Sequence, residues 1–174
     1  MITTENTTNK MLSFDDAWNL GEELKVKSDF RERVADLEQI GLDENVWMSN
    51  EEFDKKNPLK HTFTDGCYVR EVFAPADQLL ITKIHKIEHP FFLMQGEVSI
   101  LTEKGVERLK APHHGITRPG TKRVMYTHSD MVFITVHATD KKTVEEVEDE
   151  VIAKDFNDPL VTAEDFELLK NRQI

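Results

Sequence analysis

The sequence has 174 residues, 39% of them hydrophobic and 32% charged, with a formal net charge of −11 at pH 7. That length is sufficient for one domain with a hydrophobic core and some appended segments. The acidity argues against non-specific nucleic-acid binding and against docking on anionic lipid, and no apolar run approaches the ~20 residues of a membrane span.

The N-terminus and the cysteine content indicate a cytoplasmic protein. The first residues, MITTENTTNK, are polar and lack the apolar centre of a signal peptide. Cys67 is the single cysteine, so the chain cannot form an internal disulfide bond, as expected for a reducing compartment.

The N-terminal third has a helical pattern. Residues 1–12 read as a disordered tail rich in Thr and Asn, and residues 13–65 as a helical N-terminal extension. One helix is predicted to begin at Ser13. Another is predicted over Phe30–Ile40, where apolar residues recur at helical spacing and Gly41 follows as a stop signal.

Residues 66–140 have the pattern of short strands. The runs rich in strand-forming residues are Tyr68–Phe73, Leu79–Ile87, Phe91–Leu101, Arg123–Tyr126 and Met131–His137. Glycine and proline turn signals separate them, and residues 127–130 predict a hairpin between the last two. Short strands at regular spacing predict a small β-sandwich or barrel.

Residues 141–174 predict C-terminal helices. Thr143 and Glu146 have the spacing of a capping box, and Val147 and Val151 would lie on one face of the helix that follows. The expected fold is therefore mainly β, with α-helices flanking the strands at both ends.

Two histidines four residues apart fall at the junction of two predicted strands. His85 ends one strand and His89 begins the next. Because side chains alternate along a strand, His85 shares a face with Lys83, and His89 shares one with Gln95. Two neighbouring strands can therefore direct both imidazoles into one interior, with Lys83 and Gln95 as candidate ligand-binding residues.

A third histidine can be sought from the geometry of the predicted hairpin. If the chain turns at 128–130, Arg123 pairs near Thr135, and His137 shares their inward face. The three histidines would then suit a divalent Zn, Fe, Ni or Mn ion, with positions left open for water or substrate. The alternative is that His137 is a strand-end histidine that makes one hydrogen bond.

Lys83 and Arg123 would bring positive charge close to this metal site, which is electrostatically costly. They need an anion between them, and Glu71 on the first strand could be that carboxylate. One interpretation is a pocket for a small carboxylate or phosphate molecule that Arg123 binds bidentately. The others are an internal ion pair of Glu71 with either cation, and replacement of the metal by the two cations.

The spacing of these residues resembles the cupin family of small β-barrels, whose fold is a double-stranded β-helix. The first cupin motif has two histidines, then a glutamate, then a glycine that leads into the next strand. Gly96 matches that glycine, so His89 falls at the glutamate position, His85 at the second histidine and Lys83 at the first.

The second cupin motif and several sequence blocks extend the resemblance. Pro119 and Gly120 resemble the turn of that motif, and Arg123 falls at its histidine position. The blocks IHKIEHP, MQGEVSILTEKG, RLKAP, PGTKR and MVFITVHATD resemble short cupin-like proteins common in bacteriophage genomes. The resemblance implies a cupin-like barrel over residues 66–140, and a host-cell or virion location if a phage encodes the chain.

Three functions are compatible with this pattern. The first is a metal-dependent cupin enzyme, an oxygenase, isomerase or lyase that acts on a small anionic molecule. The second is a non-catalytic phage structural or accessory protein that uses the barrel as a scaffold, and the third is a small-molecule-binding sensor. Outward apolar residues such as Phe92 and Met94 predict a cover of helices or of a second subunit, and hence a homo-oligomer.

Overall fold

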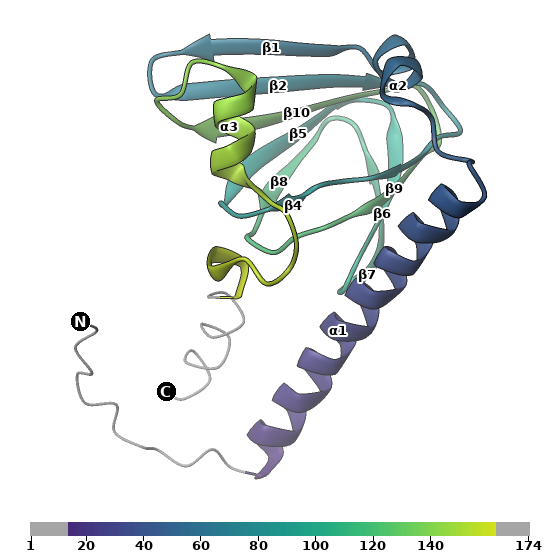
Figure 1. The fold of residues 1–174 in the computed structure, drawn as a ribbon, viewed down its shortest axis with the longest axis vertical. Coiled ribbons are helices and arrows are strands. Elements are labelled where there is room, and N and C mark those ends of the chain that lie inside the picture. The colour runs from purple at the N-terminus through teal and green to yellow at the C-terminus, as the bar shows by residue number, and fades with distance from the viewer. Residues whose placement is uncertain (1–13, 163–174) are drawn as a thin grey trace.

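The computed structural model describes residues 14–162 and contains two larger antiparallel sheets, a two-stranded sheet and flanking helices (Figure 1). The expected tail at 1–12, and the part of the predicted C-terminal helices beyond residue 162, lie outside the described residues. Within the described part of the chain, no helix is long and apolar enough to cross a membrane.

Most of the strands belong to two sheets. The larger sheet, in the spatial order β1-β2-β10-β5-β8, contains β1 (Leu59–Thr64), β2 (Cys67–Ala74), β10 (Met131–Ala138), β5 (His89–Gln95) and β8 (His113–Thr117). The second sheet, in the order β3-β9-β6-β7, contains β3 (Leu79–Ile81), β9 (Val124–Thr127), β6 (Glu97–Thr102) and β7 (Gly105–Lys110). The short strand β4 (Ile84–His85) pairs with β11 (Ile152–Ala153).

The chain alternates between the two larger sheets as it proceeds. From β2 it enters the second sheet at β3, returns at β5, crosses to β6 and β7, returns at β8, crosses to β9 and comes back at β10. This path is that of a double-sheet jelly roll, an architecture that includes the cupins. Within the described residues the two larger sheets share no strand pair, so they do not close into the expected barrel.

The predicted hairpin around residues 127–130 does not form. β9 pairs with β3 and β6, whereas β10 pairs with β2 and β5, so the connection between them passes from one sheet to the other. Its polar groups are bonded elsewhere: the His128 N–H donates to the Glu97 carbonyl at 2.8 Å, and the Asp130 carboxylate accepts from the Ala76 N–H at 3.0 Å. These bonds hold the connection as a corner between two sheets.

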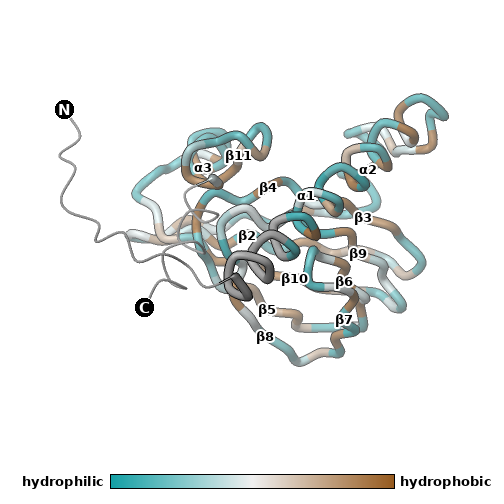
Figure 2. Tube along the Cα trace, turned by 90° about the horizontal axis from the view of Figure 1, so that it is seen from below, coloured by the Kyte–Doolittle hydropathy of each residue, from teal (hydrophilic) through white to brown (hydrophobic). Residues whose placement is uncertain are grey.

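The hydrophobic core lies between the inner faces of the two sheets. Its buried residues are Val72, Ala74, Phe91, Leu93, Val98, Ile100, Leu109, Met125, Met131 and Phe133. Along β10 burial alternates, so that Phe133, Thr135 and His137 point inward while their neighbours are partly exposed. Figure 2 shows that the strands contain both hydrophobic and hydrophilic stretches.

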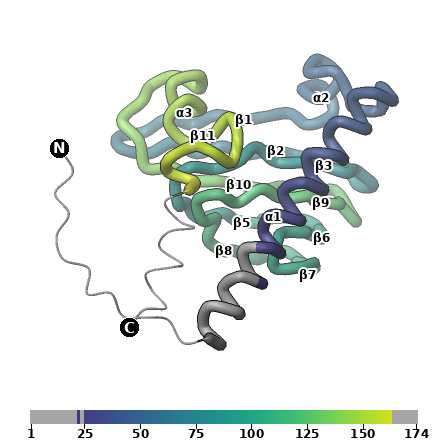
Figure 3. The backbone as a smooth tube through the Cα atoms, turned by 60° about the horizontal axis from the view of Figure 1, so that its bottom comes forward, coloured from purple at the N-terminus to yellow at the C-terminus, as the bar shows by residue number. Residues whose placement is uncertain are grey.

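One continuous helix, α1 (Phe14–Asp43), replaces the two helices that we expected before residue 41. It continues through Gly41, against which the indole of Trp47 packs so closely that a Cβ there would lie 2.0 Å from Trp47 Nε1. The same Nε1 donates to the Glu38 carbonyl oxygen at 2.9 Å. In Figure 3 this helix runs past β3, and its C-terminal part reaches the second sheet.

Between α1 and the first sheet the chain forms a short helix and a strand. Helix α2 (Asn50–Lys56) begins with a capping box made by Ser49 and Glu52. Strand β1 begins at Leu59 and belongs to the first sheet. The end of the segment 13–65, which we expected to be helical, is therefore a strand.

After the last strand of the first sheet the chain forms helix α3 (Val144–Val151). It begins with the predicted capping box, in which the Thr143 hydroxyl accepts from the Glu146 N–H and the Glu146 carboxylate accepts from the Thr143 N–H. Its two buried valines pack against Tyr68 of β2, which joins α3 to the first sheet.

Candidate metal-binding site

Three histidines from different strands lie close together between the sheets; His89 and His137 are buried, and His85 is partly buried. His85 ends β4, His89 begins β5 and His137 lies near the end of β10. The ring centroid of His89 lies 4.4 Å from that of His85 and 4.2 Å from that of His137, and the last two are 6.0 Å apart. The structure therefore brings together the three histidines that the sequence offers as metal ligands.

The backbone at His85 is held from two sides. Its N–H donates to the Thr121 carbonyl at 3.3 Å, and its carbonyl accepts from the Gly120 N–H at 2.8 Å. On the other side, the Lys86 N–H donates at 2.8 Å to the carbonyl of Val151, the last residue of α3. The turn that resembles the second cupin motif and the end of α3 thus position this imidazole.

Each of the three rings has one buried nitrogen without a hydrogen-bond partner among the described residues: Nδ1 of His85, Nε2 of His89 and Nδ1 of His137. The other nitrogen of His89, Nδ1, lies 3.0 Å from the Ile87 carbonyl, to which it can only donate, so Nε2 keeps its lone pair. Nε2 of His137 lies 3.2 Å from the Thr135 hydroxyl. Buried polar atoms normally have hydrogen-bond partners, so three unpartnered nitrogens in one cluster indicate a binding site for an ion or molecule.

Burial keeps the three rings neutral. It lowers the pKa of His85 to about 2 and the pKa of His137 to about 3, and the neighbouring His89 contributes to both shifts. Burial also lowers the pKa of His89, against the opposing effect of its bond to the Ile87 carbonyl. A neutral imidazole is the form that binds a metal, so the cluster is in its ligating state at pH 7.

The spacing of the rings fits one ion shared by three imidazoles. With metal–nitrogen bonds of about 2 Å and tetrahedral angles, the ring centroids of two ligating histidines lie about 5 Å apart. The observed separations of 4.2, 4.4 and 6.0 Å bracket that value. As the rings stand, no group of three His, Cys, Asp or Glu side chains in the described residues is arranged to hold an ion, so binding requires these rings to turn.

Arg123 is buried beside the histidines, with 6% of its surface exposed. Its Nη2 donates to the Thr117 hydroxyl at 2.8 Å, and its guanidinium carbon lies 5.1 Å from the centre of the Phe91 ring. Burial lowers the pKa of Arg123 to about 10, and the charge of Glu103 opposes that shift. Arg123 is therefore charged at pH 7, and it forms no ion pair with a carboxylate of the described residues.

A second arginine, Arg70, enters the same interior from β2 and was not among the predicted site residues. It is aligned with Thr135 of β10 and lies between the buried Tyr68 and Val72. Burial lowers the pKa of Arg70, and the charges of Tyr68 and Glu148 oppose the shift. The alternation of Tyr68, Arg70 and Val72 was the available signal, because it places Arg70 on the apolar face of the strand.

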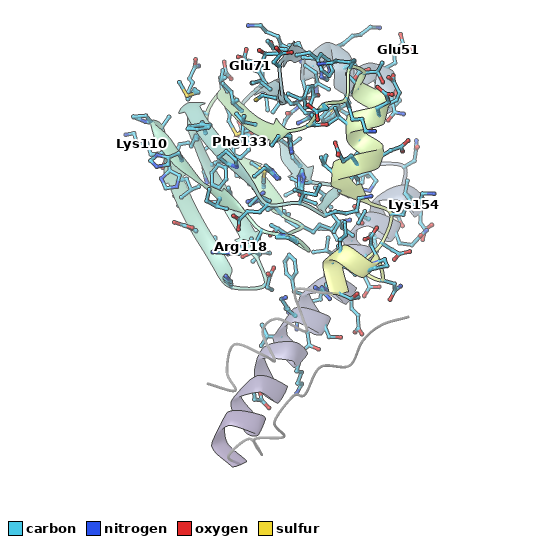
Figure 4. All side chains as sticks on the ribbon, turned by 90° about the vertical axis from the view of Figure 1, so that its left-hand side faces the viewer. Glu51, Glu71, Lys110, Arg118, Phe133 and Lys154 are labelled. Atoms are coloured by element: carbon cyan, nitrogen blue, oxygen red, sulfur yellow. The ribbon has the colours of Figure 1, made fainter. Side chains whose placement is uncertain are left out.

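Glu71, the carboxylate that the sequence offers to these cations, lies on the opposite face of β2. It is aligned with Lys60 of β1 and with the outward Ile134 of β10. In Figure 4 Glu71 lies near the upper edge of the molecule, whereas Phe133 lies in its interior. The expected ion pair of Glu71 with Arg123 or Lys83 is absent from the described residues.

Lys83 and Gln95 lie apart from the histidines. Lys83 is an exposed residue that lines the cavity beside the cluster, and its Nζ lies 2.8 Å from the carboxylate of Glu148 on α3. Gln95 is exposed at the other end of β5 from His89, level with Val132 of β10. Lys83 therefore has a carboxylate partner of its own, and Gln95 is not part of the cluster.

A cavity of about 710 Å³ adjoins the cluster and is lined by His85, His137, Arg70 and Arg123. Most of its other walls are apolar, and the C-terminal part of α1 with the loop after it forms one of them. The volume lies in the range of roughly 300–1,000 Å³ typical of small-molecule sites. This wall could not be predicted from the sequence, because helical periodicity does not show which helix face meets which strand.

Comparison with known proteins finds similar solved structures only, since no family model and no curated protein matches. The DMSP lyase DddQ from Ruegeria pomeroyi is similar at a TM-score of 0.47 and 18% identity, over 56% of this chain and 53% of that one. A cupin-2 domain protein from Shewanella frigidimarina is similar at a TM-score of 0.41 and 13% identity, over 57% of this chain and 100% of that one. An acetylacetone dioxygenase from Acinetobacter johnsonii is similar at a TM-score of 0.39 and 15% identity, over 46% of this chain and 58% of that one.

The fold assignment rests on the order of the strands, because these similarities are low. Two antiparallel sheets face each other, the chain alternates between them, and their inner face carries His89 and His137. This is the double-sheet arrangement to which cupins belong. The protein therefore has a mainly β, cupin-like fold with flanking α-helices, as its sequence predicted.

Proposed function

We propose that this protein binds a divalent metal ion through His85, His89 and His137 and holds a small anionic molecule in the adjoining cavity. The observation that carries the proposal is the cluster of three neutral imidazoles, each with a buried ring nitrogen that lacks a partner among the described residues. Such a donor set suits Zn, Fe, Ni or Mn. The nearby guanidinium groups of Arg70 and Arg123 would repel the ion, so a bound anion is needed to balance the charge.

A metal with three protein ligands has positions left for substrate or water. It supplies a Lewis acid that polarises a bound oxygen and lowers the pKa of a bound water molecule. The apolar walls of the cavity would shield the reacting groups from bulk water. We propose an oxygenase, isomerase or lyase as the reaction class.

Elemental analysis of protein purified without an affinity tag tests the metal site. We expect about one equivalent of a divalent transition metal per chain in the wild type, and loss of most of it in His85→Ala, His89→Ala and His137→Ala, since each removes one of three ligands. His114→Ala is the matched control, because His114 is exposed on β8 and its ring lies beside Phe92. Equal metal content in all five proteins would overturn the site and favour a non-catalytic scaffold or a small-molecule sensor.

A further inference from the structure

We infer that the molecule held in the cavity is an amphipathic carboxylate, with a hydrocarbon body and one carboxylate head group that binds Arg70 and Arg123. This inference rests on the proposed function for the place of the ligand, and it adds the chemical class. Its basis is that one cavity combines two guanidinium groups without an acidic partner and extended apolar walls.

The charged residues around the cavity leave two positive charges uncompensated. The lining carboxylates are those of Glu38 and Glu148. Glu38 accepts from Lys122 Nζ at 2.7 Å, and both oxygens of Glu148 lie 2.8 Å from Lys83 Nζ. The two remaining lining cations are the arginines, and neither forms an ion pair with a described carboxylate.

Arg123 has the stronger need of an anion, because only 6% of it is exposed. A guanidinium group has five N–H donors, and within the described residues its side chain donates one hydrogen bond, to the Thr117 hydroxyl. A buried charge without a counter-charge is costly. A carboxylate in the cavity would supply both the charge and acceptors for two parallel N–H bonds.

Arg70 lines the same cavity from the other sheet. It comes from β2 of the first sheet, whereas Arg123 immediately precedes β9 of the second. A head group between the sheets therefore meets donors from both sides. His85 and His137 line this cavity too, which places the head group beside the proposed metal.

The rest of the cavity favours hydrocarbon. Met125, Met131 and Phe133 contribute from the two sheets, and Leu42 and Trp47 from α1 and the loop after it. An inorganic anion or acetate would pair with the arginines and leave these walls facing water. A ligand with an apolar body removes them from water, and this burial adds to its binding free energy.

Calorimetric titration of the full-length protein with octanoate, 1-octanol, acetate and octyl phosphate tests the class, in metal-loaded and in EDTA-treated protein. We expect octanoate to bind at least about tenfold tighter than 1-octanol or acetate, since tenfold corresponds to only about 1.4 kcal/mol. Equal affinity for 1-octanol would overturn the carboxylate, and equal affinity for acetate would overturn the apolar body. Tighter binding of octyl phosphate would overturn the choice of head group.

Variants locate the binding site. Arg70→Gln and Arg123→Gln are expected to weaken octanoate binding at least about tenfold and to leave 1-octanol unaffected, because only the charged contact is lost. Arg108→Gln is the control, since Arg108 is exposed on β7 and pairs with Glu97. If circular dichroism shows Arg123→Gln unfolded, Arg70→Gln decides alone. Unchanged octanoate affinity in it would overturn the inference.

The outcomes separate this inference from the metal site. If the protein purifies without metal and still binds octanoate, the proposed metal site is wrong and the proposed amphipathic ligand is supported. A stoichiometric metal content without preference for octanoate would leave the metal site and overturn the ligand class.

Discussion

At the scale of single residues, we expect the histidines of the cluster to make the folded state sensitive to acid. The folded pKa values of about 2 for His85 and about 3 for His137 mean that neither ring takes up a proton between pH 7 and pH 5. In the unfolded chain a histidine has a pKa of about 6.5 and does take one up. The contribution of these two neutral rings to the free energy of unfolding is therefore fully present above about pH 6.5. It is lost progressively as the pH falls toward the folded pKa values.

We expect the free energy of unfolding of the EDTA-treated protein to fall below pH 6.5 by up to about 1.4 kcal/mol per pH unit for each such ring. His137→Asn removes one titrating ring and keeps a polar group near Thr135, so it should reduce the slope. Urea unfolding at pH 7, 6 and 5 measures it. An unchanged slope in His137→Asn would show that His137 is protonated in the folded state as well.

At the scale of elements, one wall of the cavity depends on a contact between a helix and the loop that follows it. Trp47 packs its indole directly on Gly41 of α1 and donates to the Glu38 carbonyl. Both Glu38 and Trp47 line the cavity. Gly41 therefore allows the Trp47 ring to approach the helix backbone closely. It does not end the helix, because α1 continues to Asp43.

Gly41→Ala should therefore destabilise the protein although alanine favours helix. The added Cβ would lie 2.0 Å from Trp47 Nε1, so the indole must move. Overpacking costs about 1–3 kcal/mol and the gain in helix propensity is about 1 kcal/mol, which leaves a net loss of up to about 2 kcal/mol. In a Trp18→Phe background, where Trp47 is the one remaining indole, the emission of Trp47 should shift.

The control for this substitution is Ser28→Ala, at an exposed position of the same helix. It should leave both the unfolding free energy and the emission spectrum nearly unchanged. A Gly41→Ala protein as stable as this control, with unchanged emission, would contradict the contact.

At the scale of the whole molecule, the outer face of the first sheet is apolar and partly exposed. Met94 of β5 and Ile116 of β8 are 56% and 53% exposed, and Phe92 and Ile134 lie on the same face. Apolar residues grouped on one sheet face are typical of a surface that another subunit covers.

We expect the protein to be a homo-oligomer through this face. Ile116→Lys should lower the molar mass in size-exclusion chromatography with light scattering, because a charge would be buried in the interface. Val106→Lys is the matched control, since Val106 is 70% exposed on β7 of the other sheet. A monomeric wild type would contradict this prediction.

The faces of the strands could be predicted from the sequence, whereas the pairing of the strands could not. His137 points inward as predicted, because it lies on the inner face of β10 and the inner faces of both sheets meet in one core. The hairpin from which this orientation was inferred does not form. The charge of Glu71 predicts a carboxylate partner for the two cations, but the two-residue period of β2 places Glu71 on the outer face of the sheet. Strand partners and the continuity of α1 depend on contacts between distant segments, which local patterns do not contain.

The attachment of α3 to the segment beside His85 ties the C-terminal end of the described chain to the spacing of the imidazoles. β11 follows α3 and pairs with β4, and the last residue of α3 accepts from the Lys86 N–H. His89 and His137 are held by a different sheet. We expect a displacement of α3 to move the His85 ring relative to the other two, so that the position of this helix affects whether the cluster offers three donors or two.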